Sequence, residues 1–371
     1  MLSSPAPVRP IVVIQSDDWG RVGVPSLYVL DQIRQAVPGV GDSRWDFYGL
    51  ETAADLEALG NELEAIRDTD GAPACITGNF IMANADLRLM AENGFARGIY
   101  KPISEGFPAP WTDSLVPAYR ALVDRKVFYP GLHGFTHFNA PVLEGALADP
   151  GDLGERARLL ARLDTPYLRS VTPEYNFALL SMPAGSEVFL AAERQKQWLR
   201  SGIQIFEDVF GFWPVTFCAP GYRSNDVTRR LLEANGVAGI QLPSKAPPMR
   251  DGGLVVLGRN VAFEPALWKS DRAALIEQAL AEGEAAVARG TPIIICSHSI
   301  NYMTRFLDRA GEARSDLALF LGRLKDRFPD LRFAGDADLI RAWKQADPAW
   351  FRPPTLREQA ERLVEAGRDR R

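Results

Sequence analysis

The chain has 371 residues, 46% of them hydrophobic and 24% charged, a composition typical of a globular protein with a large buried core. Its net charge is −5 and its Lys and Arg residues form no dense run, so we expect no nucleic acid partner. The sequence shows no secretory signal pattern and no apolar run of membrane-spanning length, so we expect a cytoplasmic protein with reduced cysteines.

Apolar runs of strand length alternate with helix-length periodic segments along most of the chain. The predicted strands lie at residues 11–15, 74–77, 127–132, 215–218, 239–242, 254–257, 293–297 and 331–334. The predicted helices lie at residues 53–67, 113–126, 186–210, 227–234, 271–289 and 317–327. This alternation predicts an α/β fold with a mostly parallel sheet, either open or closed.

Two regions depart from the alternation. Residues 140–185 hold several prolines and one short helical piece at 154–163, and we interpret them as an insertion that covers the rim of the site. Residues 352–371 are charged and amphipathic, which predicts a surface helix that docks on the body or on a second subunit of a homo-oligomer. We therefore expect one domain over residues 1–345, with a charged helical tail at 346–371.

The residues able to carry chemistry follow the predicted strands. Asp17 and Asp18 come after the first strand, His133 and His137 lie at the end of a middle strand, and His298 follows a late one. These are the only three histidines of the chain. In a parallel barrel the carboxyl ends of the strands form one rim, where barrel active sites are built, so we expect these side chains to converge.

The spacing of His133 and His137 favours a metal site. Four residues make one helical turn, so both imidazoles can reach one ion, and two imidazoles with one carboxylate suit a catalytic divalent metal such as zinc. At a strand end the backbone turns, so one of Asp17 and Asp18 can bind the ion while the other faces its water. The alternatives are an accidental histidine pair and a helix-capping or turn role for the aspartates.

His298 is suited to donate a proton to a leaving amine, because a histidine pKa can lie near the working pH. The alternative is a structural histidine whose hydrogen bonds are satisfied within the protein. Trp19 can wall the pocket or pack in the core, and packing is the favoured interpretation. Asn79 follows a predicted strand and can face the site, with a turn residue as the equal alternative.

Together these motifs resemble the NodB-homology polysaccharide deacetylases of carbohydrate esterase family 4. The resemblance covers residues 11–334 and rests on Asp17-Asp18, His133-x-x-x-His137, the turn at residues 219–222 and His298, in the family's order. It implies a distorted (β/α) barrel that holds one divalent metal ion and hydrolyses N-acetyl or related amides, mostly on sugars.

The resemblance also implies roles for individual residues. Asp18, His133 and His137 would bind the metal, Asp17 would be the general base and His298 the general acid. The backbone N–H of Gly221 would stabilise the oxyanion. We expect Tyr222 to contact substrate, together with Trp19 and Asn79.

One motif departs from the family's pattern. The family places an arginine two residues before Pro220, where it orients the base, and this chain has Cys218 there. We expect another cation to take its place, with Arg223 as the candidate.

The predicted function is a metal-dependent amide hydrolase that deacetylates an N-acetylated sugar or a precursor of a surface polysaccharide. Zinc is the expected metal, with Co²⁺, Ni²⁺ and Mn²⁺ as alternatives. The other functions open at this point are hydrolysis of a small non-sugar amide on the same scaffold and an inactive glycan-binding homologue.

Overall fold

The computed structural model describes residues 3–37, 43–166, 178–179, 188–268, 271–303 and 310–368. Its centre is a ten-stranded sheet with the strand order β11-β12-β2-β3-β6-β7-β8-β10-β9, in which β13 also pairs with β2. In chain order these strands are β2 (Ile11–Trp19), β3 (Ile76–Ile81), β6 (Phe128–Gly134), β7 (Thr216–Phe217), β8 (Gly239–Pro243), β9 (Met249–Asp251), β10 (Leu254–Arg259), β11 (Val261–Ala262), β12 (Ile293–His298) and β13 (Arg332–Phe333).

The pairing is parallel throughout except between β9 and β10. The prediction of an α/β fold with a mostly parallel sheet is therefore confirmed. β10 and β11 are separated by Asn260 alone, and the N–H of Asn260 donates to the carbonyl of Ile294 at 2.9 Å. The chain thus passes directly from pairing with β8 to pairing with β12. The path itself runs open from β11 to β9, so the closed barrel stays a prediction.

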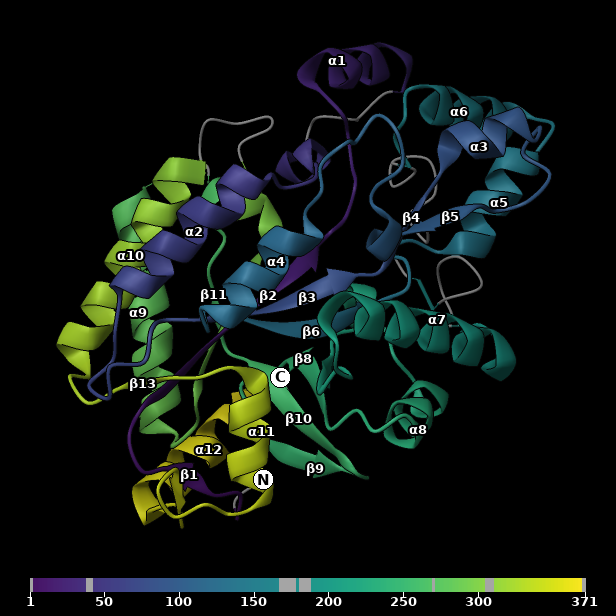
Figure 1. The fold of residues 1–371 in the computed structure, drawn as a ribbon. Coiled ribbons are helices and arrows are strands. Elements are labelled where there is room, and N and C mark those ends of the chain that lie inside the picture. The colour runs from purple at the N-terminus through teal and green to yellow at the C-terminus, as the bar shows by residue number, and fades with distance from the viewer. Residues whose placement is uncertain are drawn as a thin grey trace.

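Helices surround this sheet (Figure 1). In the view of Figure 1, α2, α9 and α10 lie to its left, α7 and α8 to its right, α1, α3, α5 and α6 above it, and α11 and α12 below. The helices are α1 (Leu27–Ala36), α2 (Ala53–Ala65), α3 (Leu87–Glu92), α4 (Val116–Asp124), α5 (Ala140–Ala148), α6 (Asp152–Arg162), α7 (Ala192–Phe210), α8 (Asp226–Ala234), α9 (Arg272–Ala288), α10 (Ala310–Arg327), α11 (Asp336–Lys344) and α12 (Leu356–Arg368).

Strand β2 is longer than its apolar run predicts. The run Ile11 to Ile14 is buried as expected, but the strand continues through the polar residues that follow, and all nine of its residues are buried. The reason is its central place between β12 and β3, which pair with it on both sides. Polar side chains are thereby carried into the interior, where they need partners.

The region expected to be an insertion is more helical than predicted. It contains α5, which begins at Ala140, as well as α6, which matches the expected piece at 154–163. Both helices pack on α1 and α3 through a second apolar cluster that includes Leu30, Leu87 and Leu143. Residues 167–177 and 180–185 of the expected insertion lie outside the described residues.

The tail docks on the body of its own chain. β14 (Phe351–Arg352) pairs antiparallel with β1 (Ala6–Pro7), and α12 follows.

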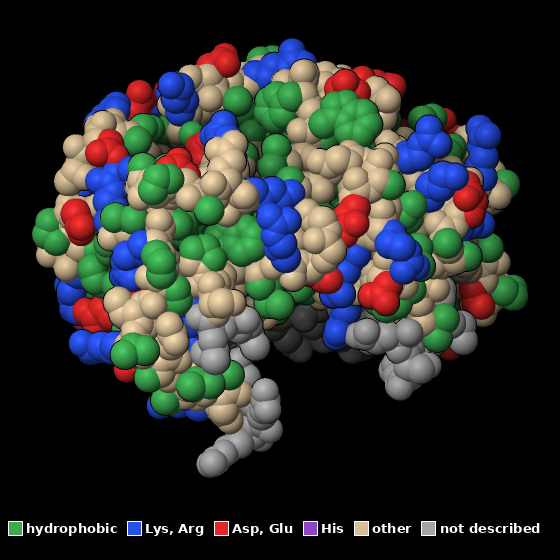
Figure 2. Space-filling view, turned by 90° about the horizontal axis from the view of Figure 1, so that it is seen from below, with side chains coloured by type: hydrophobic (Ala, Val, Ile, Leu, Met, Phe, Trp, Pro, Cys, Tyr) green, Lys and Arg blue, Asp and Glu red, His purple; other side chains and the backbone are tan. Residues whose placement is uncertain are grey.

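The face seen from below, in Figure 2, carries interspersed basic and acidic side chains. Within the described ranges, no helix is both long enough and apolar enough to cross a bilayer.

Arg362 of α12 fixes this docking, because its buried guanidinium donates to the carbonyls of Ser4, Arg289 and Gly290 at 2.7 to 2.8 Å. Arg362→Ala should lower the free energy of unfolding by roughly 2–4 kcal/mol, since it leaves buried carbonyls without donors. The exposed Arg357→Ala is the matched control and should change it by less than about 0.5 kcal/mol. Urea denaturation measures both, and equal effects would contradict the docking role.

Candidate active site

The carboxyl ends of β2, β6 and β12 meet around one pocket of about 150 Å³. The parallel register pairs His298 with Asp17, which brings residues 281 positions apart in sequence onto neighbouring strand ends. The pocket is lined by Asp17, Asp18, Arg21, Trp45, Tyr48, His133, His137, Gly221, Tyr222 and His298. All three histidines and both adjacent aspartates therefore lie at one site.

Asp18, His133 and His137 form a set of donors that fits a divalent cation. Oδ1 of Asp18 lies 3.3 Å from Nε2 of His133 and 3.0 Å from Nε2 of His137. This buried oxygen has no hydrogen-bond partner. Two imidazole nitrogens and a carboxylate oxygen facing one point are the donors that zinc and similar ions take in catalytic sites.

A local distortion turns Asp18 toward the histidines. The register between β2 and β3 shifts between Ser16 and Trp19, and Asp18 has a φ of +74° in the left-handed region. Without the shift, Asp17 and Asp18 would point to opposite faces of the strand. A non-glycine residue in this strained conformation is often found at functional sites.

The spacing of His133 and His137 suggested that both lie on a helix, but they do not. β6 ends at Gly134, and His137 lies in the turn that follows. Gly134 has a φ of +115°, and a Cβ there would lie 1.8 Å from the Trp198 ring, so only glycine fits. Trp198 also donates to Thr136 at 3.2 Å. The turn brings both imidazoles to the same side through packing against α7 rather than through helical periodicity.

The tautomer of His133 and the protonation state of His137 suit ligation. Nδ1 of His133 lies 2.7 Å from the carbonyl of Cys218, to which it donates, and this leaves Nε2 free to bind an ion. Burial and the positive charge of Arg21 lower the pKa of His137 to about 4, despite the opposing effect of Asp18. His137 is therefore neutral at physiological pH, as a metal ligand must be.

Asp17 is held by an arginine that the sequence analysis did not identify. Arg259, at the end of β10, donates from Nη1 to Oδ2 at 2.8 Å and from Nη2 to Oδ1 at 2.6 Å. Burial would raise the pKa of Asp17, but the charge and hydrogen bonds of Arg259 hold it well below its ordinary value of 3.8. The carboxylate is thus ionised at any pH near neutrality.

Arg259, not Arg223, is the cation that pairs with Asp17. Arg223 is an exposed residue that follows the turn η4 (Pro220–Tyr222), so the expectation for it was wrong. Cys218, where an arginine was missing, places its Sγ 3.6 Å from Oδ2 of Asp17 and 3.4 Å from Nη2 of Arg259. A small side chain at this position leaves room for a guanidinium that arrives from a different strand.

A layer of buried polar side chains forms hydrogen bonds to the Asp17–Arg259 ion pair. Arg259 also donates to Gln15 at 2.9 Å and to Gln241 at 2.6 Å. Asn79 donates to Asp17 at 2.7 Å, and Gln15 and Gln241 donate to Asp336. Each of these groups is nearly inaccessible to water. The network fixes the position of Asp17, because a shift of one member would leave others unpaired.

His298 is paired with a carboxylate. Its Nδ1 lies 2.6 Å from Oε1 of Glu264, whose other oxygen accepts from Asn301 at 2.6 Å. Its Nε2 lies 3.8 Å from Oδ2 of Asp17. Burial lowers the pKa of His298, but Glu264 outweighs this effect and raises it to about 10. His298 is therefore an imidazolium at neutral pH.

Two residues expected to contact substrate lie beneath the pocket instead. Trp19 is packed against Phe128 and Tyr302 in the core, as the favoured interpretation held. Asn79 is fully buried and bonded to Asp17. Tyr222 and Gly221 do line the pocket. The N–H of Tyr222 donates within its turn to Ala219, which leaves the N–H of Gly221 as the candidate oxyanion donor.

Comparison with solved structures identifies the fold. A Mycobacterium smegmatis protein provisionally named a polysaccharide deacetylase has a TM-score of 0.50 and 17% identity over 96% of this chain and 98% of its own. This chain has the fold of the polysaccharide deacetylases. No family model and no curated protein matches the sequence.

Two further solved structures are similar to this chain with lower scores. An acetyl xylan esterase of family 4 from Clostridium thermocellum, in complex with a cobalt ion, has a TM-score of 0.40 and 11% identity over 94% of this chain and 96% of its own. A CE4 family pseudoenzyme from Bacillus anthracis has a TM-score of 0.40 and 10% identity over 91% of this chain and 68% of its own.

Sequence reasoning missed Arg259, Glu264 and the pocket residues Arg21, Trp45 and Tyr48. Arg259 had a usable signal, since it closes an apolar strand-like run in the way that His298 does. Glu264 lies in the short loop after β11 and reaches His298 only because β11 pairs with β12. No local pattern marks that contact.

Arg259→Met should lower the free energy of unfolding at pH 7 by about 3–5 kcal/mol, because it leaves the Asp17 carboxylate buried without its cation. In the wild type this stabilisation is present above the ordinary pKa of 3.8 and is lost as the pH falls toward the depressed value. The deficit of the variant should therefore shrink as the pH falls, because a protonated Asp17 needs no cation. Denaturation at several pH values measures it, with the exposed Arg223→Met as control. A deficit independent of pH would contradict the assignment.

Proposed function

We propose that the protein is a divalent-metal-dependent amide hydrolase that removes the acetyl group from an N-acetylated sugar or a surface-polysaccharide precursor. Asp18, His133 and His137 would hold the ion, with zinc as the first candidate. The fold of the polysaccharide deacetylases supports this proposal. We infer that β10 and β11 act as one bent strand that closes the sheet into the distorted barrel.

The observation that carries this proposal is the unpartnered buried Oδ1 of Asp18 facing Nε2 of both His133 and His137. A buried carboxylate oxygen without a donor is costly, and a cation at this point would satisfy it. Asp17 and His298 lie on neighbouring strand ends beside it.

The bound ion would polarise the scissile carbonyl and lower the pKa of a coordinated water. Asp17, ionised and positioned by Arg259, accepts the proton of the attacking water. The N–H of Gly221 donates to the oxygen that becomes negative as the carbonyl is attacked. His298, charged because of Glu264, donates its proton to the departing nitrogen. Base and acid thus start in the protonation states that the reaction needs.

The alternative within the same chemistry is a small non-sugar amide as substrate. This alternative is kept because the compact pocket, of about 150 Å³, admits a small amide. Acetate release from acetamido sugars by the zinc-loaded protein tests the first proposal. Release only from small linear or cyclic amides would select the second.

Removal of a ligand tests the metal site directly. His133→Ala and Asp18→Asn should each weaken zinc binding by more than the roughly 10–100-fold that loss of an outer-sphere partner costs. Elemental analysis after dialysis and competition with a chelator measure this. His298→Asn, which removes no proposed ligand, is the control and should keep the metal. Unchanged zinc content in the first two variants would reject the site.

The partner of His298 sets the pH dependence. Glu264→Gln should lower the pKa of His298 from about 10, so the alkaline limb of the activity profile should move to lower pH. The raised pKa stabilises the folded wild type fully below about pH 6.5 and progressively less as the pH rises toward 10, and the variant should lose this contribution.

NMR titration of the histidine resonances provides a readout that needs no substrate, because the chain has only three histidines. His298→Asn identifies the resonance of His298 by the signal that it removes. A resonance of His298 that titrates alike in the wild type and in Glu264→Gln would show that Glu264 does not control its proton.

A further inference from the structure

Arg21 is the one arginine that lines the candidate active-site pocket in the described residues. It lies three residues after Asp18, and its side chain is 15% exposed. Its Nη1 donates to Oδ2 of Asp18 at 3.1 Å, and its guanidinium lies over the Tyr48 ring, 4.5 Å from the centroid. These two contacts fix the plane of the guanidinium at the pocket wall.

Most of the hydrogen-bonding capacity of Arg21 is unused. A guanidinium has five N–H donors, and among the described residues only Asp18 accepts from Arg21. The side chain is partly exposed, so the donors that face the pocket are open to solvent and can bind an acceptor from outside the chain. The planar fork of arginine matches a carboxylate or phosphate in shape and charge.

The charges of the site favour the same ligand. Asp17 is paired with Arg259, Glu264 with His298, and Asp18 with Arg21. The carboxylates at the pocket are thus already matched by cations. A divalent ion on Asp18 therefore adds positive charge that no described side chain at the pocket neutralises, and this makes the loaded pocket attractive to an anion.

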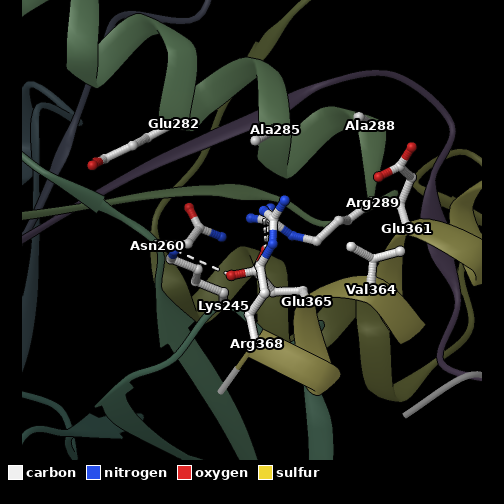
Figure 3. Close-up of a pocket in the computed structure, with 10 residues that line it drawn as sticks. All are labelled: Lys245, Asn260, Glu282, Ala285, Ala288, Arg289, Glu361, Val364, Glu365 and Arg368. Carbon is white, nitrogen blue, oxygen red and sulfur yellow. Dashed lines mark ion pairs between the residues drawn. The ribbon is translucent and has the colours of Figure 1, made fainter. Parts of the chain in front are cut away.

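Another small pocket among the described residues, of about 180 Å³, contains an anion of its own (Figure 3). It lies where α9 leads into β12 and is covered by α12. Its cations Lys245, Arg289 and Arg368 gather around Glu365. Because the protein itself supplies the anion there, that pocket offers no comparable site.

We propose that the substrate carries a carboxylate or phosphate group next to the amide that is cleaved, and that Arg21 binds this group. The inference rests on the proposed hydrolase function, since it places the anion in the same pocket. Trp45, whose ring lies 4.8 Å from that of His298, forms the adjacent wall. Arg21 would then determine which amides enter, while Asp17 and His298 perform the proton transfers.

The test compares matched pairs of probes on the zinc-loaded protein by calorimetry. N-acetylglycine is compared with N-acetylglycinamide, and N-acetylglucosamine 1-phosphate with N-acetylglucosamine. In at least one pair the anionic member should bind roughly tenfold to a hundredfold more tightly. This preference should be lost in Arg21→Gln and partly retained in Arg21→Lys. Arg200→Gln, which removes an exposed charge from α7, should keep it.

Several outcomes overturn the inference. Equal binding within both pairs, or no binding of any probe, removes the anion preference. A preference that survives in Arg21→Gln assigns the anion to the ion alone. A loss of zinc from Arg21→Gln, with both members of a pair weakened alike, assigns Arg21 to positioning Asp18.

The same probes separate this inference from the function on which it rests. Acetate release without anion preference leaves the hydrolase standing and rejects the role of Arg21. Anion preference that depends on Arg21, without acetate release from any probe, supports the binding role and rejects the hydrolase.

Discussion

Asp17 and Arg259 face each other in the interior, and the arrangement of the site depends on this ion pair. A carboxylate removed from water is costly unless a cation and further hydrogen bonds compensate for it. Here both oxygens of Asp17 receive donors from one guanidinium, and Gln15, Asn79 and Gln241 connect the pair to neighbouring strands. The residues that hold Asp17 in place thus come from β2, β3, β8 and β10 together.

The pair also explains how the site can lack an arginine in the turn before Pro220. Cys218 is small and buried, and it leaves the space beside Asp17 to a side chain from β10. A guanidinium is long enough to reach one carboxylate from either of two strands that end near it. The same charge can therefore be supplied from different positions in the sequence while the geometry around Asp17 is kept.

Asp17 and His298 lie in opposite electrostatic environments. Asp17 stays ionised because of Arg259, and His298 stays protonated because of Glu264. Two groups whose neighbours push their pKa values in opposite directions are the arrangement that acid and base catalysis requires. Asp18 and the imidazoles of His133 and His137 form a separate group, with a buried carboxylate oxygen that a cation would satisfy.

The sequence by itself determined the alternation of strands and helices, and with it the positions of Asp17, Asp18, His133 and His298 at strand ends. These follow from local periodicity, which residues near in sequence decide. It predicted the histidine pair for a wrong reason, because the glycine turn and Trp198 bring the imidazoles together, not a helix.

Only the tertiary structure decided which cation serves Asp17 and which carboxylate serves His298. Arg259 and Glu264 meet their partners across strand pairings between segments distant in the chain. Such contacts depend on strand order and register, and these are set by the packing of the whole sheet rather than by any local pattern.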